Sequence, residues 1–231
     1  MKPTAAPQSP SENPMTTRTL FAVFLAFTLV QTESIHAVES QFDVAPQNSD
    51  LVVDQTFDGP LGDKWHINTG SWKVADGVLQ AKELPADKHA AAARYTAQTD
   101  NAVYQLRFKL SDGTKAFHFG FDPAKGELDK KGHLFSVIIT PAGWRVMKHV
   151  DKNRRQDDPN EILASSDTAV ETDRWHQLRL TTWETYVTAT LDQTQLKASH
   201  PTFAVKKPTL VFRCSGDAVQ IDDVKVWNQR K

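Results

Sequence analysis

Cysteine is nearly absent from this 231-residue sequence, which has only Cys214. A single cysteine excludes an intrachain disulfide and a metal cluster built from cysteine ligands. Because Cys214 ends the strand-like apolar run 210–214, we interpret it as a small buried hydrophobic residue and not as a nucleophile.

An excess of one charge sign is also absent. The 27 Lys and Arg residues nearly balance the 28 Asp and Glu residues, and the formal net charge is -1. A nucleic-acid-binding domain is expected to carry a clear positive excess. We therefore expect no nucleic-acid partner and no attraction to an anionic membrane surface.

The sequence lacks an apolar run long enough to cross a membrane. The apolar segment 20–30 is too short, because a membrane-spanning helix needs about 20 residues. It follows Arg18 and precedes a small residue, Ala37, which is the pattern of a secretory signal peptide. We predict that 1–37 is a signal peptide with an N-terminal extension, with translation starting at Met1 or Met15. Cleavage near Ala37 would leave a secreted or periplasmic chain with no stable membrane span, whereas a retained anchor is the alternative.

No segment shows an apolar period of 3.6 residues over three turns, so helices are not expected. Many short strands separated by turn residues predict instead an all-β fold, an antiparallel β-sandwich of the jelly-roll type, with a barrel as the alternative. We predict a linker at 38–50 and a single domain at 51–229. Asp76-Gly77, between two short apolar runs, predicts a two-residue hairpin. The predicted strands after that hairpin are 91–95, 103–110, 116–121, 133–139, 144–149, 162–164, 175–182, 186–191, 196–199, 209–214 and 219–227.

The clearest strand signal is the stretch 116–122. Phe117, Phe119 and Phe121 recur with a period of two residues, and the alternate positions are polar or small. This alternation is typical of a strand with one face in the core and the other toward solvent or a ligand.

Several landmarks together resemble a known superfamily. They are Phe57-Asp58-Gly59 with Trp65, the hairpin at 70–79, the strand that begins Arg174-Trp175-His176, and the closing run 219–227. The chain resembles the concanavalin A-like lectin/glucanase superfamily, and more narrowly the secreted bacterial domains named for 3-keto-disaccharide hydrolase. The resemblance implies a jelly roll and carbohydrate, free or on a sugar-bearing polymer, as the partner. Three functions follow from it: glycan binding, which we favour; hydrolysis of glycosides or 3-keto-glycosides; and protein interaction or adhesion.

The acidic motif of family 16 glycoside hydrolases, Glu-x-Asp-x-x-Glu or Glu-x-Asp-x-Glu, is absent. The nearest match, Glu127-Leu128-Asp129-Lys130-Lys131, lacks the last glutamate and reads as a charged turn. Retaining glycosidases need two carboxyl groups about 5 Å apart. The sequence therefore does not decide whether the protein is an enzyme.

Alternate residues of a strand share one face of the sheet, and this rule predicts one polar surface. If strands 103–110, 116–121, 133–139 and 144–149 are neighbours, their polar side chains share a face, on which planar Arg and His groups suit the hydroxyl or carboxylate groups of a sugar or uronic acid. Histidine is also the usual acid or base at neutral pH. The alternative is an ordinary solvated sheet face. The predicted ligand-binding residues are Gln105, Arg107, His118, Ser136, Arg145 and His149, with Asp122 and His133 near the ends; the candidate catalytic residues are His118, Asp122 and His149.

No metal site or cofactor is predicted, because the spacing of His118, His133 and His149 matches no known ligand motif. A structural calcium ion, common in the resembling superfamily, could use Asp58, Asp222 or Asp223. Trp144 and Trp183 are each interpreted as a core residue or as an exposed platform for a sugar ring. The charged segment 151–173 is expected to be a surface loop, and the protein is expected to be a monomer.

Overall fold

The computed structural model describes residue 42 and residues 44–230. The predicted signal peptide, 1–37, lies outside these residues. Within the described part of the chain, no helix combines the length and the apolar character needed to span a membrane.

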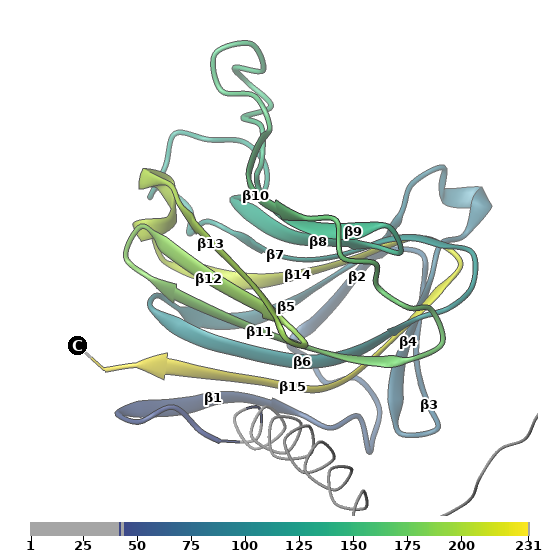
Figure 1. The fold of residues 1–231 in the computed structure, drawn as a ribbon. Coiled ribbons are helices and arrows are strands. Elements are labelled where there is room, and N and C mark those ends of the chain that lie inside the picture. Colours follow the sequence, from purple (N-terminus) through teal and green to yellow (C-terminus); the bar gives the residue numbers. More distant parts are fainter. Residues whose placement is uncertain (1–41, 43, 231) are drawn as a thin grey trace, which may run out of the picture. The chain divides into compact units, whose positions relative to one another are not determined.

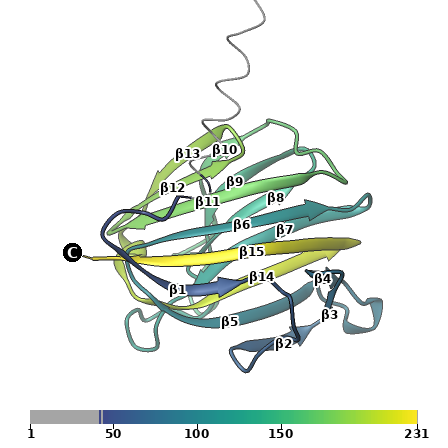
Figure 2. The ribbon, with the colours of Figure 1, turned by 90° about the horizontal axis from the view of Figure 1, so that it is seen from below.

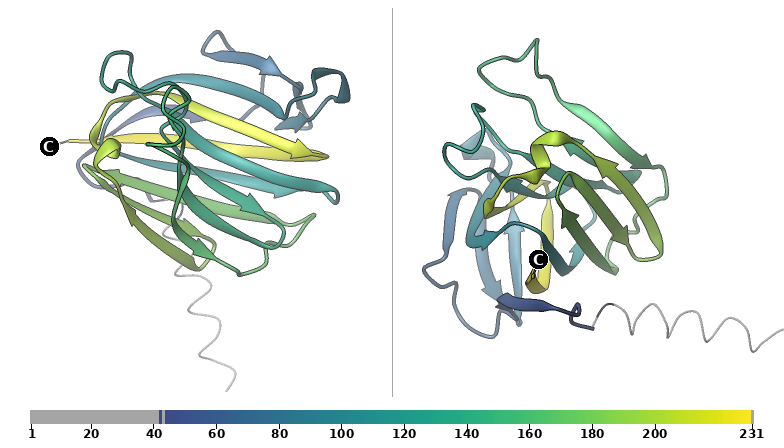
Figure 3. Two further views of the ribbon diagram at one scale, coloured as in Figure 1. Left: turned by 90° about the horizontal axis from the view of Figure 1, so that it is seen from above. Right: turned by 90° about the vertical axis from the view of Figure 1, so that its left-hand side faces the viewer.

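Two antiparallel sheets pack face to face, as the sequence predicts (Figures 1 and 2). The eight-stranded sheet runs in the order β13 (Thr194–Ser199), β12 (Tyr186–Leu191), β11 (Trp175–Trp183), β6 (Ala102–Leu110), β15 (Ala218–Gln229), β4 (Val78–Lys82) and β3 (Ser71–Ala75), with β1 (Ser49–Gln55) also paired to β15. The seven-stranded sheet runs in the order β10 (Glu161–Ser166), β9 (Gly143–Lys148), β8 (Phe135–Thr140), β7 (Thr114–Asp122), β14 (Lys207–Gly216), β5 (Ala91–Thr99) and β2 (Trp65–Thr69). Two short 3-10 helices, η1 (Pro85–Asp87) and η2 (Pro201–Ala204), lie between strands. Figure 3 shows the two layers from two further directions.

The core forms where the inward faces of the two sheets meet. Phe117, Phe119 and Phe121 of β7 are all fully buried, as the alternation predicts. They pack against β6 of the opposite sheet: the Tyr104 ring centroid lies 4.6 Å from that of Phe121, and Phe108 lies 5.3 Å from Phe117. The strands β6 and β7, although consecutive in sequence, are therefore stacked across the core and not side by side.

The hairpin predicted at Asp76-Gly77 is confirmed. It joins β3 to β4, which pair antiparallel with Ala75 opposite Val78. Both turn residues have positive φ, 55° at Asp76 and 72° at Gly77, which is the backbone conformation that a two-residue type I′ turn requires.

The edge strand β2 is not predicted from the sequence. Trp65 packs into the core, but the next three residues, His66, Ile67 and Asn68, are exposed, so no alternation marks the strand. It pairs with β5, where His66 lies opposite Arg94. β2 thereby extends the seven-stranded sheet at one edge and places polar side chains there.

Candidate functional site

The outer face of the seven-stranded sheet brings together four of the predicted ligand-binding residues. In the strand register, His118 of β7 lies opposite Ile138 of β8, which lies opposite Arg145 of β9. Ser136 belongs to the same face one step along β8, and His149 follows the end of β9 and is hydrogen-bonded to Ser136. The predicted adjacency of β7, β8 and β9 is therefore confirmed.

Gln105 and Arg107 do not belong to this surface, and their predicted place on it is wrong. Both lie on β6, which pairs with β11 and β15 in the eight-stranded sheet. Gln105 is buried there and accepts a hydrogen bond from Arg179, whereas Arg107 lies 3.5 Å from Asp223. The error arises because the apolar faces of β6 and β7 face each other across the core, so their polar faces point in opposite directions.

Asp122, at the end of β7, is held by two basic groups. One carboxylate oxygen accepts a hydrogen bond from Nδ1 of His133 at 2.6 Å, and the other accepts one from Nε of Arg94 at 2.8 Å. Burial favours the neutral carboxyl, but the hydrogen bonds from His133 and Arg94 outweigh it, and the pKa of Asp122 is lowered. Arg94 also donates to the side-chain oxygen of Asn68. The contact with Asp122 fixes the His133 ring and leaves its Nε2 as the atom available to a ligand.

A small residue makes room for a second polar pair. Ser136 Oγ lies 2.8 Å from Nε2 of His149, and both residues are buried. On the neighbouring strand, a Cβ at Gly120 would lie 2.1 Å from Ser136 Oγ and 2.7 Å from the Phe135 carbonyl oxygen. Glycine at position 120 is therefore what allows the Ser136 hydroxyl to lie beside β7 and to orient His149.

His118, which is half-buried, and His149, which is buried, are neutral at physiological pH. Burial, followed by the nearby charges of Arg213 and Arg145, lowers the pKa of His118 to about 4. Burial and the charge of His133 lower the pKa of His149 to about 3. Neutral imidazoles can accept or donate hydrogen bonds to a ligand, so the positive charge of the face comes from its arginine and lysine side chains.

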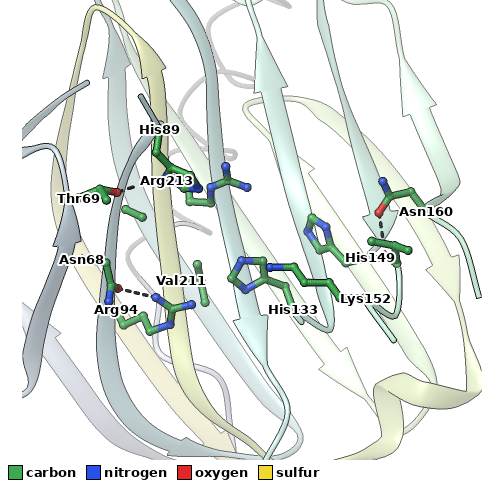
Figure 4. A pocket seen from close by; sticks show the side chains of 12 residues that line it. Asn68, Thr69, His89, Arg94, His133, His149, Lys152, Asn160, Val211 and Arg213 are labelled. Carbon is green, nitrogen blue, oxygen red and sulfur yellow. Dashed lines mark hydrogen bonds between the residues drawn. The ribbon is translucent and has the colours of Figure 1, made fainter. Parts of the chain in front are cut away.

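A pocket of about 490 Å³ opens beside these residues (Figure 4). Its volume lies in the range of small-ligand sites. Figure 4 shows His133 between Arg94 on one side and His149 and Lys152 on the other. The lining residues are Asn68, Thr69, His89, Ala92, Arg94, His133, His149, Val150, Lys152, Asn160, Val211 and Arg213.

One wall of the pocket belongs to the loop between β9 and β10, which rises from the seven-stranded sheet in Figure 1. The sequence predicts a surface loop for 151–173; the part that precedes β10 is largely exposed, but its base is buried. The side chains of Lys130 and Lys148 are 3% and 4% exposed and both contact the carboxylate of Asp158. Asp151 is fully buried and accepts hydrogen bonds from the backbone N–H groups of Lys131 and Asn153, which lower its pKa to about 2. These contacts hold the loop in place beside the pocket.

Sequence reasoning missed Arg94, Arg213, Asn68 and Lys152. Arg213 lies between the inward residues Phe212 and Cys214 of β14, and Arg94 lies in an alanine-rich part of β5. A charged residue inside an apolar strand was the available signal. Strand pairing supplies the missing part, since Arg213 lies opposite His118 and Val211 lies opposite Gly120.

The remaining candidates lie elsewhere. Trp144 is 3% exposed and belongs to the core, whereas Trp183, at the end of β11, is 41% exposed. Within residues 44–230, no group of three or more His, Cys, Asp or Glu side chains is arranged to hold a metal ion. Burial raises the pKa of Asp222, with Asp223 and Asp58 close enough to add to the effect.

Comparison by sequence finds neither a matching family profile nor a matching curated protein. Solved structures do match. The chain aligns with SCLam, a non-specific endo-β-1,3(4)-glucanase from family GH16, with a TM-score of 0.59 and 13% identity over 81% of this chain and 94% of that one. The catalytic domain of an endo-1,3-β-glucanase (laminarinase) from Thermotoga petrophila gives a TM-score of 0.61 and 12% identity over 80% and 100%. The carbohydrate binding module CBM66 from Bacillus subtilis gives a TM-score of 0.50 and 13% identity, and the alignment covers 72% of this chain and 92% of that one.

These matches establish the concanavalin A-like jelly roll as the fold of the chain. At 10–13% identity they carry information about the fold and not about the activity.

Proposed function

We propose that the protein is an exported glycan-binding protein and that the glycan binds in the pocket on the outer face of the seven-stranded sheet. The observation that carries the proposal is the pocket itself, about 490 Å³ in volume and lined by Arg, His, Asn and Lys side chains. Planar side chains with fixed donors match the hydroxyl pattern of a sugar ring.

Two further points support this function. Solved structures of the same fold include two enzymes named as glucanases and a module named as carbohydrate-binding. A polar pocket of this size also favours a small polar ligand over adhesion, because protein interfaces are usually flat and depleted of charge at their centre.

Hydrolysis is the second candidate, and the Asp122–His133 pair favours it. A histidine oriented by a carboxylate is a suitable general base, so the base would be His133, with Asp122 as its positioning residue. His149 is already hydrogen-bonded to Ser136. No aspartate or glutamate lines the pocket, which disfavours the two-carboxylate mechanism of retaining glycosidases. Free sugar released from glucosides or 3-keto-glucosides would separate hydrolysis from binding.

A glycan array followed by calorimetry tests the binding function. We expect a glycan that binds at millimolar concentration or below. His133→Ala should weaken that binding about tenfold or more, since a lost hydrogen bond to a sugar is worth about 1.4 kcal/mol. Gln177→Ala, on the eight-stranded sheet, is the control and should leave the affinity unchanged. The proposal fails if no glycan binds at millimolar concentration.

A further inference from the structure

Positive charge without a counter-charge is concentrated on the outer face of the seven-stranded sheet. Among the residues that the structure describes, Arg145, Arg213 and Lys152 form no ion pair. The pocket lining contains no Asp or Glu. The carboxylate of Asp122, at the end of β7, already accepts hydrogen bonds from Arg94 and His133. The face therefore carries three cationic side chains that form no ion pair with the residues described.

Two of these cations flank one histidine in a straight cross-strand row. Arg213 of β14 lies opposite His118 of β7, and two strands further, beyond Ile138 of β8, lies Arg145 of β9. With about 4.8 Å between neighbouring strands, the Cα atoms of the two arginines are roughly 14 Å apart. Their Nε atoms and Nδ1 of His118 are buried and have no hydrogen-bond partner in the structure. Each of the two arginines therefore keeps a hydrogen-bond donor for which the described residues supply no acceptor.

The charge state of His118 is a second sign of positive potential in this row. After burial, the charges of Arg213 and Arg145 are the next causes that lower its pKa to about 4. The same potential that disfavours a proton on His118 favours an anionic group beside it.

A neutral glycan would fit this face poorly. Covering unpaired cations with an uncharged ligand removes their water without supplying a counter-charge, which is unfavourable. An anionic group would pair with them through charge-assisted hydrogen bonds, for which the planar guanidinium fork is well suited.

We propose, resting on the glycan-binding function above, that the ligand is an anionic glycan whose carboxylate or sulfate ester group binds between Arg213 and Arg145 beside His118. Its neighbouring sugar ring would extend into the pocket toward His133. Uronic acids and sulfated sugars present the same chemistry to these arginines, a compact anion with several acceptor oxygens.

Matched pairs of polysaccharides test the proposal with the purified protein. Polygalacturonate is compared with its methyl ester, and dextran sulfate with dextran, by calorimetry at one fixed salt concentration. We expect the charged member of at least one pair to bind about tenfold or more tightly than the neutral member. The polygalacturonate pair reports on a carboxylate ligand and the dextran pair on a sulfate ester, so the two comparisons show which anion the protein binds.

Arginine variants locate the binding site. Arg213→Gln and Arg145→Gln should each weaken binding of the charged polysaccharide about tenfold, as expected for the loss of one charge-assisted hydrogen bond. Arg107→Gln, on the opposite face of the sandwich, removes the same charge and should change the affinity less than threefold. Thermal unfolding of each variant controls for folding.

The outcomes separate this inference from the function on which it rests. Binding confined to neutral sugars overturns the anionic ligand but leaves the glycan-binding function intact. An equal loss of affinity in all three arginine variants overturns the location between Arg213 and Arg145. The absence of binding to any glycan removes the proposed function and this inference with it.

Discussion

Phe119→Ala is expected to lower the free energy of unfolding by about 3–5 kcal/mol, the usual cost of removing a buried phenylalanine side chain. Phe119 is fully buried at the middle of β7. Its ring centroid lies 5.3 Å from those of Phe121 and Phe212 and 6.1 Å from that of Tyr104, so it joins both sheets. Urea unfolding followed by tryptophan fluorescence measures the effect.

Lys115→Ala on the same strand is the control for Phe119→Ala. Lys115 is exposed, and its replacement should change the free energy of unfolding by no more than about 0.5 kcal/mol. A loss below about 1 kcal/mol in Phe119→Ala would show that the aromatic face of β7 does not form the core.

Asp158→Ala is expected to destabilise the protein by about 3 kcal/mol, the lower end of the range for breaking a buried ion pair, because Asp158 itself is partly exposed. Its carboxylate contacts two buried lysines, Lys130 and Lys148. Removal of the Asp158 carboxylate leaves both ammonium groups buried without that counter-charge at the base of the loop between β9 and β10. Chemical denaturation gives the loss of stability, and hydrogen exchange shows whether the opening is confined to this loop.

The neighbouring residue supplies the control for Asp158→Ala. Asp157 is exposed and forms no ion pair within the described residues. Asp157→Ala should therefore leave stability within about 0.5 kcal/mol of the wild type. Equal effects of the two substitutions would argue against a structural role for the Asp158 contacts.

Strand positions could be predicted because they depend on local alternation. The residues of β7 show this well. Successive side chains of a strand point to opposite faces of the sheet, so the alternation of the sequence alone places Phe119 inward and His118 outward. The same parity argument could not place β6 and β7 relative to each other. Whether consecutive strands pair or stack depends on which apolar faces meet, and Tyr104 meets Phe121 across the core.

Part of the candidate site could be predicted because it lies on strands that follow one another in the sequence. His118, Ser136, Arg145 and His149 come from three strands that are consecutive in sequence and are also neighbours in the sheet. The other side of the site is built by long-range pairing, which places β14 next to β7 and β5 next to β14. No local pattern indicates that Arg213 and Arg94, distant in sequence from His118, lie on the same surface.

Binding of a glycan to the outer face of the seven-stranded sheet would change the environment of the backbone amides there. We would titrate the ¹⁵N-labelled protein with an oligosaccharide that the glycan array shows to bind, and follow the titration by the amide chemical shifts. We expect shifts concentrated at His133, His118 and Arg213 and in the loop around Lys152. Shifts confined to β6, β11 and β15, on the opposite face, would contradict it.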